Sequence, residues 1–176
     1  MNILETIKGR TSYRGAYKNI AVPREDLVKI MEAGLSAPSG CNMQTTSLIA
    51  VDNADLMRKL LRVIKPCAAR TAPAMICVLT KKIIAYRDRC FYIQDYSAAI
   101  ENMLLAAVAL GYESCWYEGH VTDADKIGRK MADILGVPDD YELVCFLPLG
   151  QAAEPLNYVN KKPFGERAWF NGFKGE

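Results

Sequence analysis

Residues 74–80 read AMICVLT, an uninterrupted apolar run, and this stretch decides the fold. A run of this length without polar alternation is typical of a strand that is buried on both faces. Two further segments have a strand-forming composition, SLIAVD at residues 47–52 and YELVCFLPLG at residues 141–150. We therefore expect a sheet at the centre of the molecule, covered by other elements.

Helical periodicity supplies the covering elements. The strongest pattern is Asp95–Leu110, with apolar residues at helical spacing and Gly111 after its end. Weaker helical patterns are expected at residues 2–8, 23–35, 54–65 and 123–135. A short strand is expected at residues 114–118. The mixture predicts an α+β fold, with a mixed or antiparallel central sheet flanked by helices, in a single domain over residues 1–176.

Composition excludes several classes of function. The net charge is +2, with 22 Lys and Arg mixed among 20 Asp and Glu, so no basic surface for nucleic acid or for a membrane is predicted. The longest apolar run, MLLAAVALG, is too short to span a bilayer. Six cysteines without a C-x-x-C pair are typical of reduced thiols, and a single histidine is too few for a histidine-based metal site. We expect a cytoplasmic protein without a metal.

The first candidate binding motif is RTSYR, residues 10–14, which follows the opening helix. Alternate residues of an extended loop project to one side, so Arg10, Ser12 and Arg14 would face a common point. Two guanidinium groups and a hydroxyl suit a phosphate or another small anion. Solvated surface cations are the alternative interpretation.

Two more segments could contact a ligand with polar edges. In APSGCNMQ, residues 37–44, Pro38 and Gly40 favour a tight loop, and side chains that donate and accept hydrogen bonds alternate at Ser39, Asn42 and Gln44. In GYESCWYEG, residues 111–119, a strand runs into a loop whose glycine would let backbone N–H groups approach a ligand. An ordinary turn and a buried strand are the respective alternatives.

A basic segment, NKKPFGER at residues 160–167, lies near the C-terminus. Lys161 and Lys162 could complete a phosphate site begun by Arg10 and Ser12, or they could simply be solvated. The chain has no Gly-x-Gly-x-x-Gly or Walker-type loop, which argues against a Rossmann or P-loop nucleotide site.

The order of these motifs resembles the nitroreductase family of FMN-dependent oxidoreductases. The resemblance consists of R-x-S-x-R near residue 10, P-S-x-x-N-x-Q near residue 40, a long apolar helix ending in G-x-x-S-C-W, and a basic segment near the C-terminus. It implies a nitroreductase-like fold and a domain-entwined homodimer with FMN at its interface. The chain departs from the family at Thr45 and Thr46, where Pro-Trp is frequent, and in a short region 81–95.

The resemblance also implies roles for individual residues. Arg10 and Ser12 would hold the FMN phosphate and ribityl chain, Arg14 would lie near the flavin N1/O2 edge, and Lys161 or Lys162 would close on the phosphate. The remaining expected cofactor contacts face the flavin ring from the partner subunit or pass beside its N5: Pro38, Ser39, Gly40, Asn42, Gln44, Tyr117, Glu118 and Gly119.

The implied activity is hydride transfer from NAD(P)H through flavin N5 to a small acceptor such as a nitroaromatic or a quinone, in a ping-pong cycle. The cofactor carries this chemistry, so no catalytic side chain is expected. Two alternatives remain: a module that stores or senses flavin without turnover, and a specialised reductase, such as a dehalogenase, on the same fold.

Overall fold

The computed structural model describes residues 2–64, 68–118, 121 and 124–173. Its central element is a four-stranded sheet in the order β1-β2-β6-β5. The strands are β1 (Thr46–Val51), β2 (Ala74–Thr80), β6 (Glu142–Gly150) and β5 (Glu113–Ser114). All three strand pairs are antiparallel. The sheet of the α+β prediction is therefore confirmed in its antiparallel form.

The strand AMICVLT is central, as its composition predicts. β2 pairs with β1 on one side and with β6 on the other, and every residue of β2 is buried. Side chains of β2 alternate between two hydrophobic cores, with Ile76 in one and Cys77 in the other. Both faces of the strand therefore need apolar residues, which explains the absence of polar alternation.

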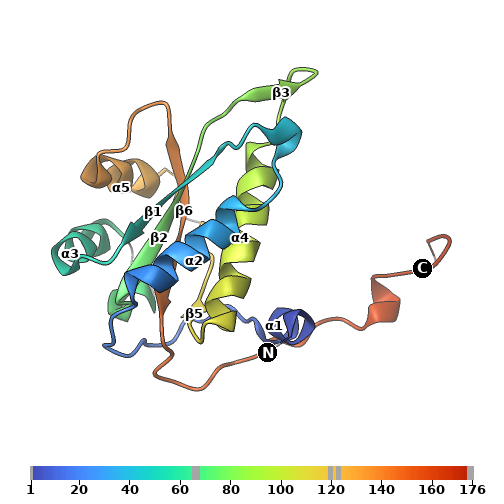
Figure 1. Ribbon diagram of the computed structural model, residues 1–176, viewed down its shortest axis with the longest axis horizontal. Helices are drawn as coiled ribbons and strands as arrows, with labels where there is room; N and C mark the ends of the chain where they lie inside the picture. The colour runs from blue at the N-terminus through green and yellow to red at the C-terminus, as the bar shows by residue number, and fades with distance from the viewer. Residues whose placement is uncertain (1, 65–67, 119–120, 122–123, 174–176) are drawn as a thin grey trace.

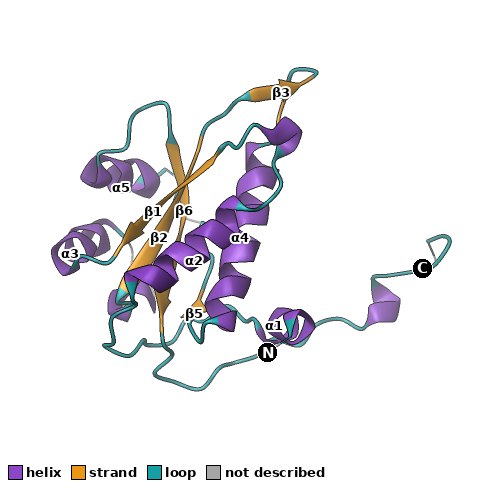
Figure 2. Cartoon of the chain, viewed as in Figure 1, coloured by secondary structure: helices purple, strands orange, loops and turns teal. Residues whose placement is uncertain are grey.

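Helices cover both faces of the sheet (Figures 1 and 2). On one face α2 (Arg24–Leu35) packs across α4 (Tyr92–Ala109), and both contribute to the core that contains Ile76. On the other face α3 (Ala54–Val63) and α5 (Ile127–Leu135) enclose the core that contains Cys77. Among the described residues, no helix has the length and apolar character needed to cross a membrane.

Two helix starts differ from the prediction. α4 begins at Tyr92, so that Asp95, the expected first residue of this helix, lies within its first turn. α5 begins at Ile127, later than the expected start at residue 123, which lies outside the described residues. Lys126 precedes α5 with a left-handed φ of 54°, which interrupts helical geometry there.

A short hairpin, β3 (Ile84–Tyr86) and β4 (Arg89–Cys90), occupies the region between β2 and α4. Its turn residues Arg87 and Asp88 both have positive φ, the geometry of a type I′ turn. This hairpin was not predicted, because its turn lacks the Asn-Gly or Asp-Gly pair by which type I′ turns are usually recognised.

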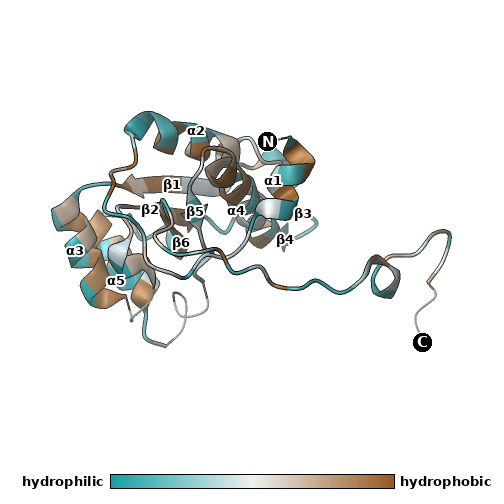
Figure 3. Cartoon of the chain, turned by 90° about the horizontal axis from the view of Figure 1, so that it is seen from below, coloured by the Kyte–Doolittle hydropathy of each residue, from teal (hydrophilic) through white to brown (hydrophobic). Residues whose placement is uncertain are grey.

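The opening helix α1 (Ile3–Gly9) is amphipathic, but its apolar side is not covered by its own chain. Ile3, Leu4 and Ile7 are all exposed, and the buried side chain of α1 is Thr6. The C-terminal segment has the same character. Residues 160–173 leave the body as an extended arm (Figures 1 and 3), with one short 3-10 helix, η3 (Phe164–Glu166), and exposed Phe164, Phe170 and Phe173.

Candidate functional site

The RTSYR loop is extended and presents alternate residues to opposite sides, as predicted. Thr11 and Tyr13 are buried, whereas Ser12 and Arg14 are exposed. The buried residues fix the loop, because the Thr11 hydroxyl donates to the carbonyl of Asn157 and the Tyr13 amide donates to that of Ser114. The exposed residues are thereby held on a rigid backbone, which reduces the entropy that binding a ligand would cost.

Ser12 and Arg14 line a cavity of about 330 Å³ together with the start of the C-terminal segment, where Glu154, Asn157 and Val159 contribute. Two hydrogen bonds hold Glu154 there. Its backbone amide donates to the Tyr13 hydroxyl, and its Oε1 accepts from the Ala16 amide at 3.4 Å. The cavity therefore combines a guanidinium, hydroxyl and amide groups and one carboxylate.

Arg10 lies at the end of α1 and is half-buried. Its Nε is 3.5 Å from Glu101 Oε1 on α4, which makes an ion pair. The same Nε is buried and has no hydrogen-bond partner among the described residues, because the geometry of the Glu101 contact is not that of a hydrogen bond. Arg10 consequently retains hydrogen-bonding capacity for an anion.

The loop 37–44 is anchored to α4 by one buried carboxylate. Asp95 is 4% exposed, and its Oδ1 and Oδ2 accept hydrogen bonds of 2.7 Å from the Gly40 amide and the Thr45 hydroxyl. Within the loop, the Gln44 amide donates to Ser39 Oγ at 3.0 Å. The predicted residues Pro38, Ser39, Gly40, Asn42 and Gln44 thus form one rigid turn.

Backbone geometry makes this turn unusual. Cys41, Asn42 and Gln44 all have positive φ, between 49° and 56°, a region that non-glycine residues seldom adopt. Cys41 and Asn42 belong to the 3-10 helix η1 (Gly40–Asn42). The hydrogen bonds of Asp95 hold the loop in this conformation, which is a pattern common at ligand-binding segments.

The segment that follows β5, residues 116–118, is also held by contacts within the chain. Glu118 accepts hydrogen bonds from the Tyr96 hydroxyl at 2.9 Å and from the Trp116 indole at 2.8 Å. Burial, followed by the contact with Glu118, raises the pKa of Tyr96 above its ordinary range. The Tyr117 ring stacks on Phe146 at 5.2 Å between centroids. The Glu118 carboxylate is thus engaged within the chain, and Gly119 lies outside the described residues.

The structure does not bring every expected residue together in one chain. Ser12 and Arg14 share a cavity, and residues 38–44 form a separate loop beside α4. Lys161 and Lys162 are exposed on the C-terminal arm, and the arm leads away from the body (Figure 3). Asp95 binds the loop 37–44 and Tyr96 binds Glu118, but neither was predicted as a site residue. The sequence feature that could have indicated Asp95 is a carboxylate within an otherwise apolar stretch of helix.

Cysteines lie both at the surface and in the core. Cys41 is exposed, Cys90 is half-buried, and Cys77 and Cys145 are buried; all four are unpaired, as expected for reduced cysteines. Burial raises the pKa of Cys77 to about 12 and also raises that of Cys145. Neither buried thiol is therefore available as a thiolate nucleophile at neutral pH. Cys67 lies outside the described residues.

Known proteins resemble this chain in both sequence and structure. An archaeal protein from Methanothermobacter thermautotrophicus, provisionally named an NADH dehydrogenase/NAD(P)H nitroreductase, is 31% identical over 88% of this chain and 79% of its own length. A crystal structure of a nitroreductase with bound FMN from Bacteroides fragilis is 30% identical, has a TM-score of 0.78, and is matched over 97% of this chain and 98% of its own.

A BluB-like flavoprotein from Clostridium difficile is 27% identical, with a TM-score of 0.84 over 97% of this chain and 99% of its own. The model of the nitroreductase family matches residues 7–69 and 61–151, which include the loops 10–14 and 37–44 and the segment 111–118. The chain belongs to the nitroreductase family.

Proposed function

We propose that this protein is an FMN-dependent oxidoreductase that moves hydride from NADH or NADPH to a small acceptor such as a nitroaromatic or a quinone. Support comes from the nitroreductase of Bacteroides fragilis, which carries FMN and matches nearly the whole chain. The provisional NAD(P)H nitroreductase name of the archaeal relative supports the donor.

The observation that carries the proposal is the RTSYR loop. Its buried residues are fixed by the Thr11 and Tyr13 hydrogen bonds, and its exposed Ser12 and Arg14 face a cavity of about 330 Å³. Nearby in sequence, the buried Nε of Arg10 lacks a hydrogen-bond partner among the described residues. Such a set of donors fits the phosphate and ribityl oxygens of FMN.

When bound, FMN supplies the centre that accepts and returns hydride, at its N5. Arg14 would stabilise negative charge at the N1/O2 edge of the ring, because a fixed cation lowers the energy of that charge without reorganisation. The loop 38–44, held by Asp95, would face the ring as a rigid wall that limits water access. Tyr117 and Glu118 would present backbone near N5, since the Glu118 carboxylate is already engaged.

The same proposal includes a homodimer with FMN at the interface. The exposed apolar side of α1 and the exposed phenylalanines of the C-terminal arm are surfaces that a second chain would cover. An arm that reaches across the partner would carry Lys161 and Lys162 to the partner's phosphate site. This arrangement would give a role to two basic residues that are exposed on the arm.

The test is direct. The purified protein should be yellow, heating should release FMN and not FAD, and the FMN-loaded protein should oxidise NADH or NADPH when menadione or a nitrofuran is present. A colourless protein that does not retain added FMN would contradict the proposal. Stopped-flow measurement of the flavin absorbance separates turnover from storage: bleaching by NAD(P)H within seconds supports the enzyme, and bleaching over many minutes supports a storage module.

A further inference from the structure

Two cysteines lie where the loop 37–44 meets the hairpin β3–β4. Cys41 belongs to the 3-10 helix η1 of the loop, and Cys90 belongs to β4. Cys41 is exposed and Cys90 is half-buried, whereas Cys77, Cys115 and Cys145 are buried. Within the described part of the chain, Cys41 and Cys90 are therefore the two thiols that a small solute can reach.

The two chain segments that carry these cysteines touch each other. A Cβ added to Gly40 would lie 2.6 Å from the Cβ of Phe91, so the two segments approach closely where residue 40 has no side chain. Cys41 follows Gly40, and Cys90 precedes Phe91. η1 also packs against β3, in which Ile84 pairs with Cys90. Both cysteines consequently belong to one small junction.

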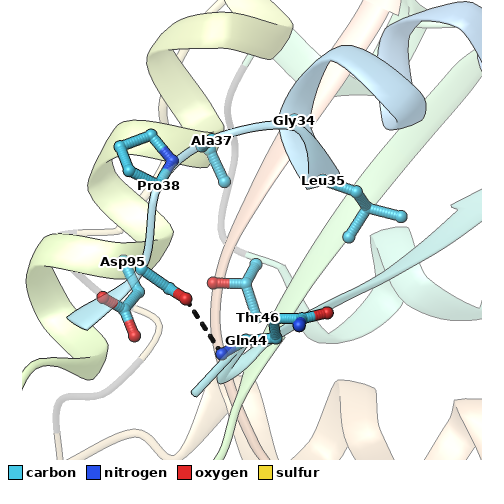
Figure 4. Close-up of a pocket in the computed structure, with 9 residues that line it drawn as sticks. Gly34, Leu35, Ala37, Pro38, Gln44, Thr46 and Asp95 are labelled. Carbon is cyan, nitrogen blue, oxygen red and sulfur yellow. Dashed lines mark hydrogen bonds between the residues drawn. The ribbon is translucent and has the colours of Figure 1, made fainter. Parts of the chain in front are cut away.

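The two sides of this junction differ in rigidity. The loop is held on α4 by the Asp95 carboxylate, which accepts the Gly40 amide and lies beside the loop in Figure 4. The hairpin consists of a three-residue and a two-residue strand, which form a sheet of their own. A two-stranded hairpin is only marginally stable by itself. A small shift of the hairpin toward the fixed loop can therefore bring the two cysteines to the Cα separation of about 4.4–6.8 Å that a disulfide requires.

We propose that Cys41 and Cys90 are an oxidisable pair that forms a disulfide with hydrogen peroxide as the oxidant, and that this bond ties the hairpin to the loop. The exposed Cys41 sulfur attacks one oxygen of the peroxide, so an S–O bond forms, the O–O bond breaks and water leaves. The Cys90 sulfur then attacks the Cys41 sulfur, the S–S bond forms, and a second water leaves with the proton of the Cys90 thiol. The two sulfurs lose two electrons, and the peroxide gains them.

The buried cysteines are poor competitors for this reaction. Burial raises the pKa of Cys77 to about 12 and also raises that of Cys145. Cys115 is 1% exposed. Because a thiol reacts with peroxide as its thiolate and must be reached by the oxidant, these three positions should stay reduced while the pair at the junction is oxidised.

The effect of the bond on activity rests on the proposed function. Under that proposal the loop 38–44 faces the flavin, and the hairpin packs against the same loop. A disulfide would fix the two segments to each other at the edge of the flavin site and restrict the motion that admits an acceptor. Reduction by glutathione or another thiol would reverse the bond by exchange.

The first measurement detects the bond itself. FMN-loaded protein is treated with hydrogen peroxide, its remaining thiols are blocked, and its peptides are identified by mass spectrometry without reduction. We expect peptides linked between Cys41 and Cys90, which should be absent before treatment and after addition of dithiothreitol. Cys41→Ser and Cys90→Ser should each lack the link. Cys115→Ala is the matched control and should retain it.

Three results of this measurement would overturn the proposal. They are a wild type without the link, a link that joins Cys41 or Cys90 to a different cysteine instead, and a link between two chains, which a non-reducing gel would reveal as a doubled mass.

The second measurement is the rate of NAD(P)H oxidation with a nitrofuran as acceptor. The wild type should slow about tenfold after peroxide treatment and recover with dithiothreitol, because a fixed hairpin slows exchange of the acceptor. Cys41→Ser and Cys90→Ser should each keep their own untreated rate after peroxide. An undiminished rate in linked wild type, or equal peroxide sensitivity in the wild type and Cys90→Ser, would overturn the control of activity.

Failure of the proposed function has a different signature. A protein that forms the Cys41–Cys90 link but oxidises no NAD(P)H, before oxidation or after reduction with dithiothreitol, would contradict the enzymatic function and leave the redox pair in place.

Discussion

Asp95 Oδ2 accepts a hydrogen bond of 2.7 Å from Thr45 Oγ1, and this contact joins the first turn of α4 to the end of the loop 37–44. The other oxygen, Oδ1, accepts the Gly40 amide at the same distance. One buried carboxylate therefore binds the chain at Gly40 and at Thr45, on either side of three non-glycine residues with positive φ. The loop's shape depends on α4 as well as on its own sequence.

Asp95→Asn should destabilise the protein by about 1–3 kcal/mol, because the amide NH₂ replaces one acceptor and leaves a buried donor group unsatisfied. Urea unfolding at fixed protein and FMN concentrations would measure the change. Asp139→Asn is the control, since Asp139 is 92% exposed in its ion pair with Arg129 and should change stability by less than about 1 kcal/mol. Equal stabilities of the two variants would contradict the anchoring role of Asp95.

Gly128 in the first turn of α5 has no space for a side chain. A Cβ there would fall on the carbonyl oxygen of Leu143 and lie 2.9 Å from that of Val121, and neither backbone group can move independently. Gly128→Ala should therefore cost about 1–3 kcal/mol, although alanine is the better helix former. Gly165→Ala is the control, because nothing lies within 4 Å of its added Cβ. Thermal unfolding of both variants would decide, and a neutral Gly128→Ala would be inconsistent with this packing.

Sequence patterns predicted the central sheet because their cause is local. AMICVLT needs apolar residues on both faces of β2, and the same requirement applies to most of β6. The start of α4 was placed three residues too late, at Asp95 instead of Tyr92, since a carboxylate resembles a helix-start signal. Its actual role, which is to bind Gly40 and Thr45 across the fold, depends on contacts between residues distant in sequence.

In the candidate site, too, features that depend on local sequence were predicted, and features that depend on contacts between distant residues were not. Alternation in RTSYR predicted that Ser12 and Arg14 share an exposed side, because extended backbone has a fixed period. Neither the unpartnered hydroxyl of Thr46 nor the Glu118 contacts with Tyr96 and Trp116 could be predicted, because each depends on the packing of several elements. The proposed phosphate contacts of Lys161 and Lys162 would require a second chain.

Acid should weaken the link between α2 and Tyr112, in the segment that follows α4. Hydrogen bonds from Lys29 and Tyr112 hold the pKa of Asp26 below its usual range. A carboxyl group with a lowered folded-state pKa contributes stability above its unfolded pKa, and this contribution is lost as the pH falls through the folded value. The stability difference between wild type and Asp26→Asn should therefore be constant near neutral pH and should shrink below about pH 4.

Urea midpoints between pH 7 and pH 3 would measure this difference. Asp55→Asn serves as the control, because Asp55 is exposed in an ion pair within the surface helix α3. A difference between wild type and Asp26→Asn that stays constant down to pH 3 would show that the contacts with Lys29 and Tyr112 do not stabilise the charged form.

Deletion of residues 160–176 should convert a dimer into a monomer if the arm contacts a second chain. The deleted segment carries three exposed phenylalanines. Without them the interface would lose the apolar area that they bury. Light scattering after size-exclusion chromatography would give the molar mass of both forms. Lys161→Ala with Lys162→Ala is the companion variant: it should remain dimeric and retain FMN less well. A full-length protein that is monomeric would contradict the dimer proposal.

Arg10→Ala should weaken FMN retention by about ten- to a hundredfold, the effect expected from losing one charge-assisted contact to a phosphate. Equilibrium dialysis with fluorescence detection of free FMN would measure the dissociation constant. Arg24→Ala provides the matched control, since Arg24 is exposed and pairs with Asp52 away from the RTSYR loop.

The Glu101 ion pair allows a second check, because Glu101→Gln removes the competing carboxylate and should leave Arg10 more available. Tighter FMN binding in Glu101→Gln together with weaker binding in Arg10→Ala would assign the guanidinium to the phosphate; unchanged retention in Arg10→Ala would remove Arg10 from the site.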